Sequence, residues 1–121
     1  MNRRNFIGSL GDAIQGLLYA FRKERNMRVH FIAAALAIAA SLCLKIEKIE
    51  LLFVLAAIFI VFIAELFNTA LERVVDLSTE EYHPLARIVK IVGAGAVLAA
   101  VVFALLVAAV VFGDRLRSLF I

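Results

Sequence analysis

Residues 51–76 read LLFVLAAIFIVFIAELFNTALERVVD, and this stretch decides the fold class. Leu51 to Ala64 are fourteen apolar residues without a break, as in a helix that crosses a membrane. A helix rises about 1.5 Å per residue, so Glu65 lies roughly 21 Å from the outer end of this span. That depth is inside the hydrocarbon or at its cytoplasmic edge. Because a carboxylate there is costly unless it is paired or functional, Glu65 is the first candidate functional residue.

The composition of the whole chain also indicates a membrane protein. The chain has 121 residues, 64% of them hydrophobic, and its mean hydropathy is +1.00. Soluble domains use only about 45–50% apolar residues, so lipid must solvate much of this chain. The length predicts one membrane-embedded domain over residues 1–121. We find no pattern of basic and aromatic residues that indicates nucleic-acid binding.

Hydrophobic periodicity predicts an all-α integral membrane protein with three transmembrane helices and an N-terminal amphipathic surface helix. In the first segment apolar residues recur every three or four positions, which suits a helix lying in the cytoplasmic interface. Pro84 suits the first turn of the last helix. In chain order we expect a surface helix at 6–21, a span at 29–44, a charged turn at 45–50, a span at 51–67 whose helix runs on to about 77, a polar break at 78–84 and a third span at 88–112.

The distribution of basic residues predicts the orientation. Six Lys and Arg residues precede the first span, and with this topology nine lie on the cytoplasmic side and four outside. An excess of Lys and Arg marks the cytoplasmic side of a membrane protein. We therefore expect a multi-pass protein of the bacterial cell membrane with a cytoplasmic N-terminus and an external C-terminus.

A polar stripe follows the apolar part of the second span. Glu65, Asn68, Thr69, Glu72 and Asp76 fall within roughly 60° of one direction on a helix. Three carboxylates on one face repel each other unless cations lie among them, and their hard oxygen atoms suit Mg²⁺. The alternative, that this half of the helix is simply solvated, is stronger for Asp76 than for Glu65.

Other polar residues are less informative when taken alone. Glu24 has an ordinary structural interpretation as a partner of Arg28 one helical turn away. Lys90 can extend its amine to the membrane surface. His30 and His83 are more typical of hydrogen-bonded structural histidines than of ligands. Taken together, however, carboxylates for a metal, a deeper carboxylate as a base and a lysine for phosphate charge are the parts that phosphoryl transfer needs.

These residues also resemble a known family. Residues 65–76, ELFNTALERVVD, resemble the signature of the prokaryotic diacylglycerol kinase family, which includes the undecaprenol kinases of Gram-positive bacteria. Glu24-Arg-Asn26 followed by His30, and residues 83–86, HPLA, resemble the undecaprenol kinase branch. Gly95-Ala-Val-Leu98 resembles the start of the third span in this family.

The resemblance implies a homotrimer whose active sites are shared between neighbouring subunits, with ATP as phosphate donor and Mg²⁺ as cofactor. The family usually has Lys-Asp where this chain has Lys90-Ile91, so an acidic residue of the nucleotide site is missing. The implied site residues are Glu65 as general base on the lipid hydroxyl, Glu24 and Glu72 as Mg²⁺ ligands, Asn68 and Asp76 along the nucleotide, and Lys90 at the β- and γ-phosphates.

The function predicted from the sequence is therefore ATP- and Mg²⁺-dependent phosphorylation of a membrane lipid alcohol, with undecaprenol favoured and diacylglycerol second. Two alternatives remain open at this point. In one, the same scaffold hydrolyses a lipid phosphate or diphosphate, with Glu65 activating water. In the other, the chain is a small transporter subunit whose intramembrane carboxylate relays ions. The transporter hypothesis predicts polar residues on more than one span. The interior of the first span offers only Ser41 and Cys43, which makes this alternative the weaker one.

Overall fold

The protein is described here by a computed structural model that covers residues 5–120. Within this range the regular structure is helical throughout. Three of the helices are long and apolar enough to cross a membrane, which confirms the predicted fold class. Arg3 and Arg4, which contribute to the predicted cytoplasmic charge, lie outside the described residues. The helices are α1 (Phe6–Lys23), α2 (Arg25–Cys43), α3 (Lys48–Ser78) and α4 (Pro84–Phe120).

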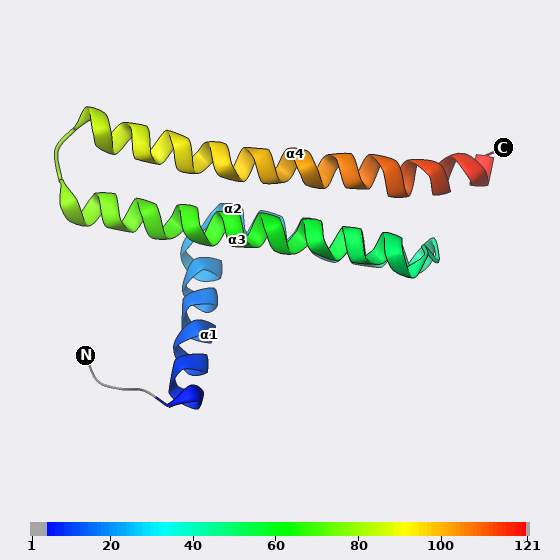
Figure 1. Ribbon diagram of the computed structural model, residues 1–121, viewed down its shortest axis with the longest axis horizontal. Coiled ribbons are helices and arrows are strands. Elements are labelled where there is room, and N and C mark those ends of the chain that lie inside the picture. The colour runs from blue at the N-terminus through cyan, green and yellow to red at the C-terminus, as the bar shows by residue number, and fades with distance from the viewer. Residues whose placement is uncertain (1–4, 121) are drawn as a thin grey trace.

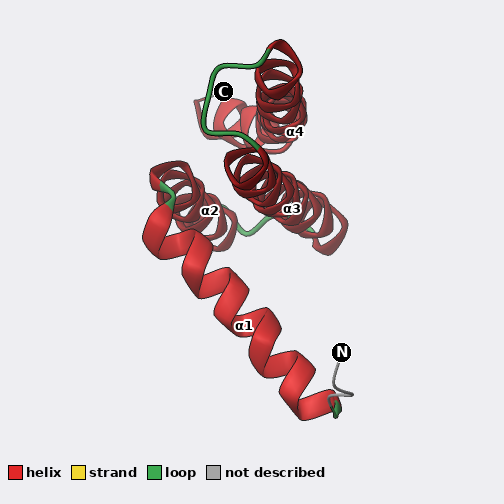
Figure 2. Ribbon diagram, turned by 90° about the vertical axis from the view of Figure 1, so that its left-hand side faces the viewer, coloured by secondary structure: helices red, strands yellow, loops and turns green. Residues whose placement is uncertain are grey.

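The three long helices form one bundle, and α1 leaves it crosswise (Figure 1). The helices α3 and α4 run antiparallel along each other, and α2 lies against another side of α3 (Figure 2). The crosswise direction of α1 is the one expected of a helix that rests on the membrane surface. Large apolar side chains of α1, such as Phe6, Ile7 and Leu17, are exposed, as such a helix requires.

The bend between α1 and α2 is made at Glu24, whose backbone is extended and interrupts the two helices. Arg28 stabilises the end of α1, since its Nη1 donates hydrogen bonds to the carbonyl oxygens of Phe21 and Arg22 at 3.0 and 2.9 Å. Carbonyl groups at the end of a helix lack partners within the helix, and a basic side chain satisfies them. The alternative pairing of Glu24 with Arg28 is therefore not what the structure shows.

The helix ends differ from the predicted ones where capping decides them. The turn between α2 and α3 is shorter than the predicted 45–50, because α3 already begins at Lys48. Glu47 and Glu50 form a capping box, in which the backbone N–H of Glu47 donates to Glu50 Oε1 at 3.0 Å. Lys45 supports the tight turn with a left-handed backbone, at φ 53°. The helix α4 begins at Pro84, as predicted, and continues beyond residue 112 to Phe120.

Ion pairs join α3 to α4 at both ends. At the outer end of the predicted topology, Arg115 Nη2 lies 2.7 Å from Glu50 Oε1. At the other end, Lys90 Nζ lies 2.9 Å from Asp76 Oδ1. Because each pair connects positions far apart in sequence, the two together define how α3 is placed along α4.

Between these ends, Gly93 of α4 packs directly against the Asn68 side chain of α3. A Cβ atom at Gly93 would collide with Asn68 Oδ1 of α3, whereas a Cβ atom at Gly95 would meet nothing within 4 Å. Small residues allow helices in membranes to pack at short range. Of the glycines at positions 93 and 95, Gly93 is thus the one whose replacement would displace Asn68.

We predict that Gly93→Ala destabilises the protein by about 1–3 kcal/mol, the usual cost of overpacking, because Asn68 has to move. Gly95→Ala is the matched control, and it should be neutral or slightly stabilising, since alanine is the better helix former. Unfolding in mixed micelles, followed by circular dichroism, measures both. Equal stabilities for the two variants would contradict the packing described at Gly93.

Candidate active site

The predicted polar stripe of α3 runs from a fully buried end to an exposed one. Glu65 is 2% exposed and is the largest fully buried side chain among the described residues. Asn68 and Thr69 are also buried, Glu72 is half-buried, and the Asp76 side chain is 55% exposed. The stripe therefore leads from the interior of the bundle to the end of α3 that is predicted to face the cytoplasm.

Asn68 connects the buried part of the stripe to Glu72. Its Nδ2 donates to Glu72 Oε1 at 3.0 Å, one helical turn farther along α3. Its Oδ1 is directed at Gly93 and is buried without a hydrogen-bond partner, as is Thr69 Oγ1. Buried polar atoms are normally paired, so such orphan atoms call for an explanation. A bound ligand that donates hydrogen bonds is one explanation.

A second cluster forms around Arg73. Its Nη2 lies 2.7 Å from Glu24 Oε1, its Nε donates to the Tyr19 hydroxyl at 2.9 Å, and its Nη1 lies 3.9 Å from Asp76 Oδ2. Asp76 is also paired with Lys90 of α4. Arg73 therefore contacts two predicted site residues, Glu24 and Asp76, and Asp76 in turn joins them to Lys90.

Sequence reasoning treated Arg73 only as a topology signal. Its position directly after Glu72 and three residues before Asp76 places it among the carboxylates and was the available clue. Lys90, interpreted alone as extending to the membrane surface, instead holds Asp76. Ile91, where the family usually has an acidic residue, is half exposed.

The acidic residues fit a magnesium ion that is shared with a nucleotide. In residues 5–120 no three His, Cys, Asp or Glu side chains come together as a ready metal site. Mg²⁺, however, commonly takes only one or two carboxylates and completes its shell with phosphate oxygens and water. Glu24 and Glu72 are both half-buried, and their negative charges act on Glu65. A cation near them would relieve this repulsion, so the donor set suits Mg²⁺.

His30 lies beside the buried carboxylate, a contact that the sequence did not reveal. Its Nε2 is 3.6 Å from Glu65 Oε2, and both atoms are buried without a hydrogen-bond partner. The sequence favoured a structural, hydrogen-bonded role for both histidines. His83 agrees with that, because its Nδ1 accepts from the backbone N–H of Leu85 at 3.1 Å. His30 has no such bond at Nε2 and contacts Glu65 instead.

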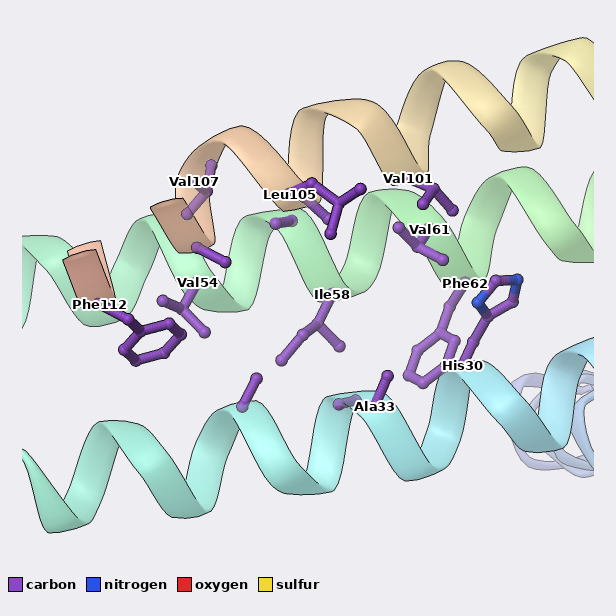
Figure 3. Close-up of a pocket in the computed structure, with 15 residues that line it drawn as sticks. His30, Ala33, Val54, Ile58, Val61, Phe62, Val101, Leu105, Val107 and Phe112 are labelled. Carbon is purple, nitrogen blue, oxygen red and sulfur yellow. The ribbon is translucent and has the colours of Figure 1, made fainter. Parts of the chain in front are cut away.

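An apolar pocket extends from His30 along the membrane-spanning part of the bundle (Figure 3). It has a volume of about 280 Å³ and lies between α2, α3 and α4. Among the described residues that line it, His30 is the one polar side chain, and the others are alanine, valine, leucine, isoleucine and phenylalanine. His30 and Phe62 stand at one end and Phe112 at the other. Such a pocket suits a hydrocarbon chain whose polar end lies at His30.

The arrangement thus places a buried carboxylate near the polar end of an apolar pocket. Further carboxylates and an arginine follow along α3, where Lys90 of α4 pairs with Asp76. A base beside a lipid-anchored hydroxyl and a charged cluster for phosphates are what phosphoryl transfer to a membrane alcohol requires.

Comparison with known proteins also indicates a lipid kinase. The prokaryotic diacylglycerol kinase family matches residues 11–112. A protein of Synechocystis named diacylglycerol kinase is 39% identical over 118 residues, which are 97% of this chain and 67% of the relative. The undecaprenol kinase of Bacillus subtilis is 33% identical, with 92% of this chain and 90% of the relative covered.

The diacylglycerol kinase of Escherichia coli K12 is 32% identical, with 83% of this chain and 82% of the relative covered. The match of the family to most of the chain includes α2, α3 and most of α4, with every predicted site residue in it. The chain therefore belongs to the prokaryotic diacylglycerol kinase family and is a multi-pass membrane lipid kinase.

Proposed function

We propose that this lipid kinase transfers the γ-phosphoryl group of ATP, with Mg²⁺, to the hydroxyl of a membrane polyprenol such as undecaprenol. The observation that carries the proposal is the apolar pocket whose one polar lining residue, His30, contacts the buried Glu65 carboxylate. A long hydrocarbon chain in the pocket brings its terminal hydroxyl to the carboxylate. The relative named undecaprenol kinase in Bacillus subtilis supports this choice.

The chemistry of the pocket favours a polyprenol over diacylglycerol. A polyprenol is one branched hydrocarbon chain with a single hydroxyl, and it needs a polar contact only at that end. Diacylglycerol brings two ester groups as well, and an ester carbonyl buried without a donor is costly. Diacylglycerol is the second candidate, because the relatives in Synechocystis and Escherichia coli carry the name diacylglycerol kinase.

In the proposed reaction each predicted site residue has one role. Glu65 takes the proton of the lipid hydroxyl as that oxygen attacks the γ-phosphorus. Glu24 and Glu72 would hold Mg²⁺ together with the ATP phosphates, and the ion would supply charge neutralisation. Asn68 and Asp76 would line the nucleotide, and Lys90 would contact the β- and γ-phosphates. Arg73, which now neutralises Glu24, lies where it can contact the phosphates as well.

Two further features stay predictions. The excess of basic residues predicts that Asp76 and Lys90 lie on the cytoplasmic side, where ATP is. The family resemblance predicts a homotrimer with shared active sites. A neighbouring subunit would cover the nucleotide end of the stripe, where the Asp76 and Lys90 side chains are 55% and 46% exposed.

The substrate can be identified by direct competition. Purified protein in lipid micelles, with Mg²⁺ and labelled ATP, should phosphorylate undecaprenol with a higher kcat/KM than diacylglycerol. One unpaired buried ester group costs about 1–3 kcal/mol, which corresponds to about a five- to hundredfold preference. Higher kcat/KM on diacylglycerol would favour the second candidate. Release of phosphate from undecaprenyl phosphate without ATP would instead indicate a hydrolase.

The roles of Glu65 and Glu72 can be separated by kinetics. Glu65→Gln keeps the size and hydrogen bonding of the side chain but removes the base, so kcat should fall by about 10²–10⁴-fold while nucleotide binding survives. Glu72→Gln removes a metal ligand and should raise the KM for Mg²⁺-ATP. Glu81→Gln, in the exposed loop between α3 and α4, is the control and should leave both parameters unchanged. A Glu65→Gln enzyme that kept most of its turnover would refute the base assignment.

A further inference from the structure

We propose that His30 is a positioning and proton-relay partner of Glu65, which orients the carboxylate and removes from it the proton given up by the lipid hydroxyl. This inference rests on the proposed function and adds a residue to the site. It concerns the pair of side chains that α2 and α3 contribute to the polar end of the apolar pocket.

The geometry of the pair is the first argument. His30 Nε2 and Glu65 Oε2 face each other at 3.6 Å, and within residues 5–120 neither atom has a hydrogen-bond partner. A hydrogen bond between these atoms requires about 2.7–3.2 Å, which a small movement of either side chain provides. Catalytic hydrogen bonds are often long before substrate binds and shorten in the complex. Each atom is thus an available partner of the other.

The path of the proton is the second argument. The Glu65 side chain is 2% exposed, and a carboxyl group that has accepted a proton there has to lose it before the next turnover. The His30 side chain is 17% exposed and also lines the pocket. It is therefore the less enclosed member of the pair. Histidine changes its charge between about pH 5 and pH 8, so it can accept a proton and release it again under ordinary conditions.

Carboxylates lie on one side of the His30–Glu65 pair, and the apolar pocket lies on the other. From α3, Glu65 faces the imidazole, and the negative charges of Glu24 and Glu72 act on Glu65 from the α1–α2 junction and from α3. From α4, the side chains that line the pocket are apolar. An imidazolium formed here thus meets carboxylates on one side and no competing cation on the pocket side.

The step balances without any further reactant. As the lipid oxygen forms its bond to the γ-phosphorus, the bond from that phosphorus to ADP breaks. The O–H bond of the alcohol breaks, and its proton passes to Glu65 Oε2 and then to His30 Nε2, which is free to accept it because the neutral imidazole carries its own proton on Nδ1. The imidazolium then gives a proton to water. Nothing is oxidised or reduced.

The competing explanation is that His30 only fills the end of the pocket. His30→Gln separates the two, because the glutamine amide reaches the position of Nε2 and can form a hydrogen bond with the Glu65 carboxyl group but cannot carry a proton. We expect kcat with undecaprenol to fall by about 10²-fold, at the lower end of general acid–base effects, with the KM for ATP unchanged. The dependence of kcat on pH should lose the ionisation that His30 contributes.

Two further measurements make the test independent of one variant. In His30→Ala, added imidazole should restore part of kcat by occupying the space left beside the pocket. His83→Asn is the matched control, since asparagine keeps an acceptor at the position of Nδ1, and its kinetics should equal those of the wild type. The oligomeric state and thermal stability of each variant are measured alongside.

A correctly assembled His30→Gln enzyme with the kcat and pH profile of the wild type would overturn the relay. So would a variant in which only the KM for the lipid rises, because that is the effect of a pocket residue. Where His30→Gln does not assemble, failure of imidazole to restore His30→Ala has the same consequence. A wild type that phosphorylates neither alcohol would instead refute the proposed function, which keeps the two failures distinct.

Discussion

The burial of one carboxylate is the constraint on which this structure depends. A lone ionised group inside apolar helices is unfavourable, and it persists only where neighbouring polar groups or a function offset the cost. Glu65 meets this condition through His30 from α2, and the stripe of Asn68 and Glu72 continues the polar surface toward the exposed end of α3. The apolar pocket on the other side of His30 is where we propose that the lipid alcohol binds, and a base at this depth would meet a hydroxyl that cannot leave the membrane.

The packing of α3 on α4 keeps that stripe in place. The ion pairs of Glu50 with Arg115 and of Asp76 with Lys90 hold the two helices at their ends, and Gly93 leaves room for Asn68 between them. A shift of α4 by one turn would break both ion pairs and place a side chain against Asn68. Residues of the proposed site, Asn68, Asp76 and Lys90, therefore also take part in the packing of α3 on α4.

Much of the fold could be predicted because lipid imposes simple rules. The lengths of the apolar stretches predicted the three spans, and helical periodicity predicted that the polar side chains between positions 65 and 76 share one face. In the structure, the burial of these side chains decreases along that face. The predicted start of α3 after residue 50 was wrong. The Glu47–Glu50 capping box starts the helix at Lys48, within a stretch that looks like a charged turn. The contacts of Arg73 and His30 with the site carboxylates were not predicted, for a different reason. Periodicity assigns a residue to a face, but the partner across the interface depends on how α1 and α2 pack against α3, which no local pattern contains.

The central claim is that a lipid alcohol lies in the apolar pocket with its hydroxyl at Glu65 and His30. Photolabelling with two polyprenol analogues tests it most directly, one with a diazirine in the first isoprene unit and one with the diazirine several units farther along. The account predicts that the first analogue labels residues near Phe62 and the second labels residues near Phe112, and that unlabelled undecaprenol suppresses both. Labelling confined to side chains outside the pocket, such as Leu98 or Leu106 of α4, would contradict the account.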